Sequence, residues 1–296
     1  MRSLCGFINA AGLLERPTVP DVWRAYMDLY ATESAIATRP GGWSPERVRA
    51  WLVEKAGDAV GRVGGPDVAS LPRHPGVTIR FIGVYDTVGA LGVPLAGATK
   101  VNEPIVGFHD TGIGAEIEHA VQVLAVDEKR GPFVPTLWTL AEGATLAPAQ
   151  TVLQVWFPGV HSDVGGGYAD KGIGNVTWDF MMRQATRRGL VVDPARPTPT
   201  VKLDPLPVQH ESFNAEWRLL SARLHILPMG VRTIGPTVLG PSGAMLTAAG
   251  EVRLHPSLIG RFGQRCTTIV DEAKGVRQEG VYAPGNVSPD TLPGFS

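Results

Sequence analysis

Two stretches of the chain share one pattern, in which a nearly apolar run is followed at once by polar residues and glycines. Residues 152–168, VLQVWFPGVHSDVGGGY, open with β-branched and aromatic residues and stop at a Pro-Gly pair. A run that is short and stops abruptly predicts a buried strand rather than a helix. His161, Ser162 and Asp163 follow directly. They are therefore expected beyond the carboxyl end of a strand, where open α/β sheets bind ligands.

The second stretch is residues 77–94, VTIRFIGVYDTVGALGVP, which ends its apolar run at Asp86. A strand that is apolar almost throughout is typical of a sheet with both faces covered. The chain thus presents an acid and then a histidine, each at a strand end, in the order that the acid and base follow in α/β-hydrolases. A polar surface loop also contains glycine and such side chains, so a purely structural role stays open for His161.

Amphipathic periodicity predicts the helices around these strands. They are expected at residues 1–14, 22–33, 110–127, 176–189 and 211–227, with another from Ser44 to the glycine-rich region at 61–65. Residues 133–138 read as a short extended segment, and residues 254–262 as a turn entering a short helix. The charged run at 127–130 is interpreted as a solvated helix end.

These elements predict an α/β fold of three layers with a partial, mostly parallel sheet. We expect residues 1–296 to form a single domain whose last part, from about residue 268, is an irregular polar tail. The absence of a repeat or a linker along the chain favours this organisation.

Composition narrows the function. A chain that is 44% hydrophobic and 19% charged is ordinary for a globular protein, and a net charge of −1 gives no electrostatic reason to expect nucleic acid. Cys5 and Cys266 cannot form a disulfide framework and have no zinc-site spacing, and we expect no cofactor. No apolar run approaches the ~20 residues of a membrane span, and the first residues lack a secretory signal, so we expect a cytoplasmic product as synthesised.

An α/β-hydrolase also needs a nucleophilic serine on a tight elbow, written G-x-S-x-G. No serine of this sequence has a glycine both two residues before it and two residues after it. An acid–histidine pair without a serine hydroxyl can polarise water but loses nucleophilic catalysis.

Four segments, FIGVYDTVGALGVP, VLQVWFPGVHSDVGGGY, AVDEKRGPFVPTLW and RLHPSLIGRF, resemble an α/β-hydrolase family long described as a domain of unknown function. That family includes the catalytic domains of type VI secretion phospholipase effectors, and the likeness covers nearly the whole chain. The resemblance implies a serine-type ester hydrolase, similar to lipases and phospholipases, with Asp86 as the triad acid and His161 as the base. It also implies a small-molecule or lipid ester substrate, export by a contact-dependent secretion system, and a delivery or immunity partner.

In that family a Gly-Phe-Ser-Arg-Gly-Ala elbow directly precedes a helix similar to MRSLCGFINAAGLL. We therefore expect this chain to be truncated at its N-terminus relative to the family, through a mis-called start, a gene fragment or a split gene. The nucleophile, the elbow strand and the strands before it would then be missing, and the chain alone would be inactive. The strands that end at Asp86 and near Asp163 would border an empty central slot in the sheet.

Two other functions stay open. The chain could be a catalytically silent fragment or pseudoenzyme that retains a binding cleft. It could also be a metal-assisted hydrolase that uses His109, Asp110, His161 and Asp163 as ligands. A turn residue is the default interpretation of Asp163, and support of His161 by Asp163 or Ser162 is the alternative.

Overall fold

The computed structural model describes part of the chain. The described residues are 8, 13–15, 72–74, 76–88, 112–114, 116–140, 143–195, 204, 206–224, 230–235, 237–239 and 245–287. Leu13–Leu14 form strand β1, which pairs antiparallel with β2, Arg73–His74, so the end of the first expected helix is a strand. The rest of that helix, apart from residue 8, and the helices expected at 22–33 and from Ser44 lie outside the described residues.

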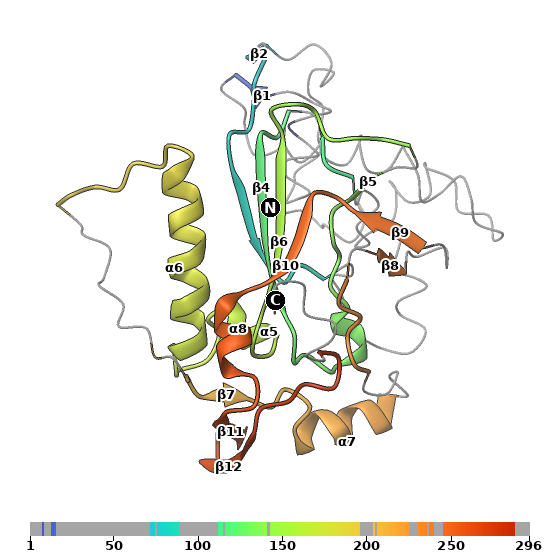
Figure 1. The fold of residues 1–296 in the computed structure, drawn as a ribbon, viewed down its shortest axis with the longest axis vertical. Helices are drawn as coiled ribbons and strands as arrows, with labels where there is room; N and C mark the ends of the chain where they lie inside the picture. Colours follow the sequence, from blue (N-terminus) through green and yellow to red (C-terminus); the bar gives the residue numbers. More distant parts are fainter. Residues whose placement is uncertain are drawn as a thin grey trace, which may run out of the picture.

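The centre of the structure is a sheet of four parallel strands, in the order β10-β6-β4-β3 (Figure 1). Their bounds are β3 Ile82–Tyr85, β4 His119–Ala125, β6 Thr151–Phe157 and β10 Glu251–Leu254. The α/β class and the two strands predicted before Asp86 and His161 are confirmed. Because these strands run in parallel, their carboxyl ends meet at one edge of the sheet.

Strand β4 corrects the sequence interpretation, which expected a helix at 110–127. All seven residues of β4 pair with β6, and four of them also pair with β3. Six of the seven are buried, because both faces of the sheet are covered. Apolar residues on both sides of a strand imitate the pattern of a buried helix. The position between the two predicted strands is therefore occupied by β4, and the expected empty slot is not there.

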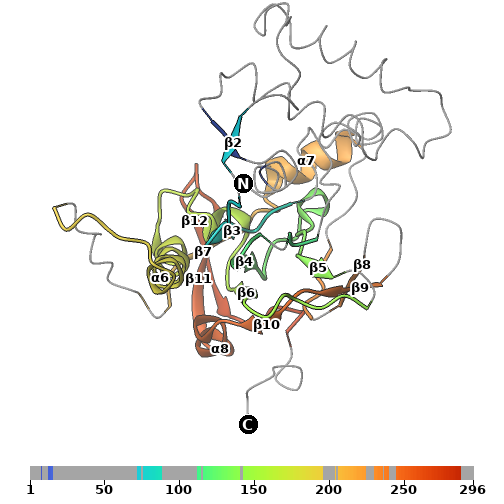
Figure 2. The ribbon, with the colours of Figure 1, turned by 90° about the horizontal axis from the view of Figure 1, so that it is seen from above.

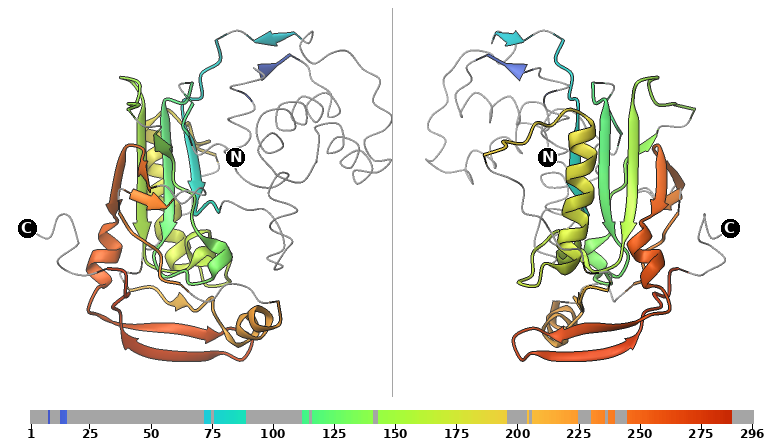
Figure 3. Two further views of the ribbon diagram at one scale, coloured as in Figure 1. Left: turned by 90° about the vertical axis from the view of Figure 1, so that its right-hand side faces the viewer. Right: turned by 60° about the vertical axis from the view of Figure 1, so that its left-hand side comes forward.

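Helix α6, Gly172–Arg187, covers one face of the sheet and confirms the helix predicted at 176–189 (Figure 3). Between α6 and the strands β4 and β6 lies a hydrophobic core. It contains Val121, Val123, Ala125, Val155, Phe157, Val164, Ile173, Val176, Phe180 and Met181. Close contact is part of this packing, because a Cβ on Gly83 of β3 would lie 2.5 Å from the sulfur of Met181.

The opposite face is covered by a smaller antiparallel sheet (Figure 2). It has the order β5-β9-β8, with β5 Thr139–Leu140, β9 Met245–Ala248 and β8 Thr237–Leu239. The short helix expected near residue 254 is present as α8, Pro256–Arg261, with His255 as its N-cap.

Beyond the carboxyl edge of the parallel sheet lies a third group of elements. Strands β11, Arg265–Asp271, and β12, Val276–Val281, form a hairpin, and β7, Gln209–His210, pairs with β11. This hairpin stands where the sequence predicted an irregular tail from about residue 268. Helix α7, Ala215–Leu224, falls within the helix predicted at 211–227. None of the helices in the described part is long and apolar enough to span a bilayer.

Candidate active site

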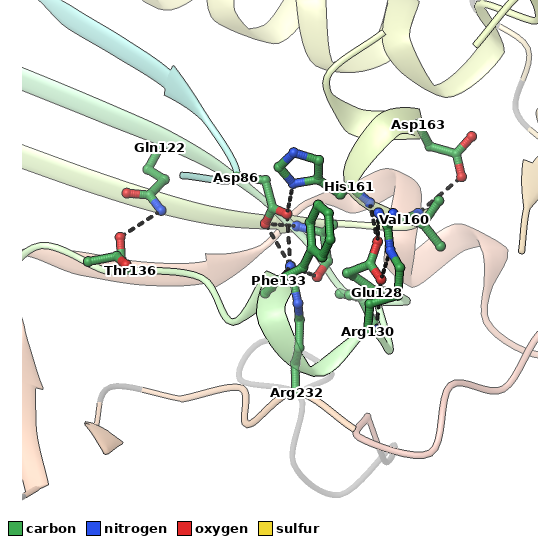
Figure 4. A network of polar contacts seen from close by, with 12 residues as sticks. Asp86, Gln122, Glu128, Arg130, Phe133, Thr136, Val160, His161, Asp163 and Arg232 are labelled. Carbon is green, nitrogen blue, oxygen red and sulfur yellow. Dashed lines mark hydrogen bonds and ion pairs between the residues drawn. The ribbon is translucent and has the colours of Figure 1, made fainter. Parts of the chain in front are cut away.

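The structure brings Asp86 and His161 together at the carboxyl edge of the sheet (Figure 4). Asp86 follows β3, and His161 is the first residue of the one-turn helix α5, His161–Val164, which follows β6. Nδ1 of His161 lies 2.7 Å from Oδ2 of Asp86. The two residues are 75 positions apart in sequence, and strand β4 lies between their strands. Their catalytic role stays a prediction, but their contact is a fact of the fold.

The turn between β6 and α5 depends on Gly159. Its φ is +103°, a conformation that side chains rarely adopt, and a Cβ there would lie 2.8 Å from the Cβ of Asp163. Its N–H donates to Oδ2 of Asp127 at 2.6 Å. The tight turn places His161 within reach of Asp86 at the end of β3.

Asp86 is held by its backbone as well as by its side chain. Its N–H donates to the carbonyl of Val123 on β4 at 2.6 Å, and its φ of +40° is unusual for a residue other than glycine. Oδ1 accepts from the N–H of Ala125 at 3.0 Å and from Arg232 at 2.6 Å, and Oδ2 accepts from Arg232 at 2.9 Å. The carboxylate therefore has four hydrogen-bond contacts in all: two with Arg232, one with the Ala125 N–H and one with His161.

The protonation state of Asp86 follows from these contacts. Burial alone would raise its pKa, but the charge of Arg232 and the hydrogen bonds from His161, Arg232 and the Ala125 N–H outweigh burial and lower the pKa below its ordinary value. An ionised carboxylate accepts a hydrogen bond from a protonated Nδ1. In the neutral imidazole this leaves the lone pair on Nε2 of His161 free. The imidazole is 30% exposed, whereas the Asp86 side chain is fully buried. This arrangement suits a general base.

An aromatic platform supports the ring of His161. The ring of Phe133, at the end of the 3-10 helix η3, Gly131–Phe133, meets the imidazole edge to face with centroids 5.2 Å apart. The guanidinium of Arg130 lies 3.6 Å from the centroid of Phe133, and the Trp217 ring of α7 lies 6.0 Å from it. The contacts with Arg130 and Trp217 hold Phe133 in place, and its edge-to-face contact favours this orientation of the imidazole.

Glu128 stabilises the start of α5 through a hydrogen bond to its first residue. Its carboxylate accepts from the N–H of His161 at 3.2 Å and from Ser212 at 2.8 Å, and it pairs with Arg130 at 2.9 Å through both guanidinium contacts (Figure 4). Burial would raise its pKa, but the bonds and charge of Arg130 and the bond from Ser212 lower it instead. Asp127 and Glu128 are both buried, so the interpretation of 127–130 as a solvated helix end is corrected. In this run Arg130 pairs with Glu128, and Lys129 pairs with Glu211.

Asp163 has a larger part than the turn residue expected by default. It does accept a local bond, from the N–H of Val160 at 3.0 Å. It also accepts from the backbone N–H of His210 on β7 at 3.1 Å and lies 2.6 Å from Nδ1 of the same residue, and the His210 ring stacks on Tyr168. Asp163 is buried, and Ser162 beside it is half-buried. Its support of His161 is therefore indirect, through the placement of α5.

Two of the four ligands expected for a metal site, His109 and Asp110, lie outside the described residues. The other two proposed ligands have different partners, Asp86 for His161 and His210 for Asp163. Within the described residues, no three or more His, Cys, Asp or Glu side chains gather in a way that could hold a metal ion.

Sequence reasoning missed three residues of this site: Arg232, Glu128 and His210. Glu128 had a signal, because it belongs to the segment AVDEKRGPFVPTLW that carries the resemblance. His210 ends a proline-rich stretch that reads as loop, and Arg232 stands in a short segment without periodicity. Neither of these two could be connected to Asp86 or Asp163 without the fold.

Comparison with known families gives one match. The family model described as T6SS, Phospholipase effector Tle1-like, catalytic domain matches residues 1–184, which is more than half of the 296 residues. The matched part contains both Asp86 and His161. A search of curated proteins and a search of solved structures each find no match.

Proposed function

The chain belongs to the family of T6SS phospholipase effector Tle1-like catalytic domains, and from this membership we propose that its domain hydrolyses lipid esters with His161 as the general base and Asp86 as the acid that orients it. The observation that carries the proposal is the 2.7 Å contact between Nδ1 of His161 and Oδ2 of Asp86 at the carboxyl edge of the parallel sheet. Delivery by a secretion system and an immunity partner are proposed on the family alone.

In this reaction His161 moves one proton in each half. Nε2 takes the proton of a serine hydroxyl as its oxygen attacks the ester carbonyl, and the imidazolium then gives that proton to the leaving alcohol. The acyl group stays on the serine until His161 activates a water that releases it as a carboxylic acid. Asp86 stays ionised throughout, keeps the proton of the imidazole on Nδ1, and stabilises the imidazolium.

The serine is the part that the 296 residues do not offer in an elbow. Among the described residues, strand β3 pairs with β4 on one side, and its other edge has no strand partner. A parallel strand added at that edge would end beside Asp86, because the carboxyl ends of parallel strands meet. We propose that the elbow implied by the resemblance, directly before the segment MRSLCGFINAAGLL, supplies the serine at this place.

The test compares two proteins. One is the 296-residue chain, and the other is the same chain extended upstream through the elbow that the adjoining DNA should encode. We expect the extended protein to release fatty acid from phospholipid vesicles and to react with a serine-directed fluorophosphonate. The 296-residue chain should do neither, because none of the serines in its sequence stands in a G-x-S-x-G elbow.

Two results would count against the esterase. Hydrolysis by the extended protein that survives His161→Ala would remove His161 from the base position. Upstream DNA that encodes no elbow would favour the silent alternative, in which the chain only binds. Direct binding of lipid vesicles to the 296-residue chain, measured by co-sedimentation, would then be the property to pursue.

A further inference from the structure

Arg232 makes the most extensive polar contacts with the proposed acid. Its guanidinium donates to both carboxylate oxygens of Asp86, at 2.6 Å to Oδ1 and 2.9 Å to Oδ2, in the paired geometry that suits a carboxylate. The same guanidinium donates to the carbonyl oxygens of Ala125 and Phe133. Its side chain is 5% exposed and that of Asp86 is fully buried. This is an ion pair inside the protein.

Arg232 also shares an oxygen with the histidine. Oδ2 of Asp86 accepts from Arg232 and from Nδ1 of His161, and Oδ1 accepts from Arg232 and from the N–H of Ala125 (Figure 4). Two donors on each oxygen fix the carboxylate against rotation about its Cβ–Cγ bond. The direction of Oδ2 toward His161 is therefore set partly by Arg232.

The segment that carries Arg232 is fixed to the site at two points. The N–H of Gly230 donates to the carbonyl of Lys129 at 3.0 Å. The side-chain amide of Asn286 donates to the carbonyl of Arg232 at 3.1 Å and to that of Val126 at 3.1 Å. Arg232 lies outside residues 1–184, the part that the family model matches. The guanidinium thus reaches the acid from a separately anchored segment.

From these contacts we propose that Arg232 is a positioning residue of the His161–Asp86 pair, which keeps the buried carboxylate ionised and directed at Nδ1. The inference rests on the proposed function only for the use of the pair, since the contacts exist without it. A buried carboxylate without a paired charge would favour its protonated form, and a protonated Asp86 no longer orients the imidazole in the required tautomer. The groups that face Asp86 are Arg232, His161 and the N–H of Ala125.

Arg232 stabilises the ionised form of Asp86 but disfavours the protonated form of His161. A guanidinium next to Asp86 offsets part of the negative charge that would stabilise an imidazolium. The contribution of Arg232 is therefore to geometry and to the ionisation of Asp86, and it does not strengthen the base. This distinguishes a positioning role from a general electrostatic gain.

The experiment uses the 296-residue chain and needs no activity. Carbon-13 NMR of the Asp86 carboxyl group follows its protonation in the wild type, in Arg232→Gln and in Arg232→Lys. We expect the protonation midpoint to move upward in Arg232→Gln and to return part of the way in Arg232→Lys. The downfield NMR signal of the Nδ1 proton of His161, which reports its hydrogen bond to the ionised Asp86, should disappear on acidification at a higher pH in Arg232→Gln than in the wild type.

Arg183→Gln is the matched control, because Arg183 pairs with Asp179 at 2.7 Å on the exposed side of α6. It should leave the Asp86 midpoint unchanged. If Arg232→Gln unfolds the chain, Arg232→Lys alone must still move the midpoint upward, since an ammonium cannot donate to both oxygens in the same paired geometry. Identical Asp86 midpoints in the wild type and in both Arg232 variants would overturn the proposal, whatever the outcome of the hydrolysis test.

Discussion

The carboxylate of Asp163 lies 2.6 Å from Nδ1 of His210, and this contact ties helix α5 to strand β7. The same four-residue helix carries His161, whose Nδ1 lies 2.7 Å from Asp86 at the end of β3. Two acid–histidine pairs therefore meet on one helical turn, which contributes the histidine to one pair and the acid to the other. The position of His161 depends on both.

Asp163→Asn tests that dependence. The amide keeps the size of the side chain but loses the charge that receives bonds from Val160 and His210. We expect the free energy of unfolding to fall by about 1.5–3 kcal/mol, as for hydrogen bonds to buried charged groups. Urea unfolding measures it. Asp193→Asn is the control, since Asp193 is exposed and accepts a local bond from the N–H of Ala195, and equal losses in both variants would contradict the assignment.

Gly159→Ala should destabilise the turn before α5 for two reasons, the positive φ and the clash of the new Cβ with Asp163. Gly275→Ala is its matched control, because Gly275 has a φ of +66° and nothing within 4 Å of the built Cβ. We expect each variant to lose about 1–3 kcal/mol from backbone strain, and Gly159→Ala to lose more than Gly275→Ala. Thermal unfolding of the two proteins side by side decides it, and a smaller loss for Gly159→Ala would rule out the clash.

Asp127 predicts a pH dependence of stability. Burial raises its pKa from 3.8 to about 6, although the Gly159 N–H and the Tyr282 hydroxyl donate to it. Because the pKa is higher in the folded state, protonation of Asp127 stabilises the fold. This contribution is complete below pH 3.8 and is lost as the pH rises to about 6. Asp127→Asn lacks this titration. Its stability relative to the wild type should therefore improve between about pH 4 and about pH 7, by up to about 3 kcal/mol.

Urea unfolding of both proteins across that pH range is the measurement. Only the change with pH is diagnostic, because the altered hydrogen bonds of the amide to Gly159 and Tyr282 shift the stability by an amount that does not depend on pH. A difference between the two proteins that does not vary with pH would show that Asp127 is not the titrating group.

For the extended protein that carries an elbow serine, His161→Ala and Asp86→Asn should each lower kcat by about four orders of magnitude, by analogy with catalytic triads. The loss should be in kcat more than in KM, because the pair acts on the proton and not on the lipid. Release of fatty acid from vesicles measures both constants. His74→Ala, a change at an exposed histidine of β2, should behave as the wild type, and near-normal turnover of either site variant would refute the roles.

The strands before Asp86 and His161 could be predicted because their apolar runs stop sharply at polar residues. Strand β4 could not, because both of its faces are buried and a short apolar run without alternation does not distinguish a strand from a helix. The truncation implied by the family resemblance suggested an empty slot between the two predicted strands, whereas pairing in space puts β4 there.

The contacts of the site were beyond sequence reasoning for a different reason. Arg232 and Asp86 are 146 positions apart, and His210 and Asp163 are 47 apart, so no local periodicity relates them. Buried charge does leave a general expectation that a partner exists. It does not say which of the chain's many cations is the partner, and only the fold does.

The anchoring of Arg232 by Asn286 bears on how this protein can be divided. A recombinant fragment that ended at residue 184, where the family match ends, would retain Asp86, His161 and Asp163. It would lose Arg232, His210 and the edge strand β10, which pairs with β6 along four residues. Asp86 would then lack its guanidinium partner and Asp163 its imidazole partner, at a cost comparable with the whole stability of a small domain. The cooperative folding unit that contains the site therefore extends at least to Asn286, and fragments for biochemical work should not stop before it.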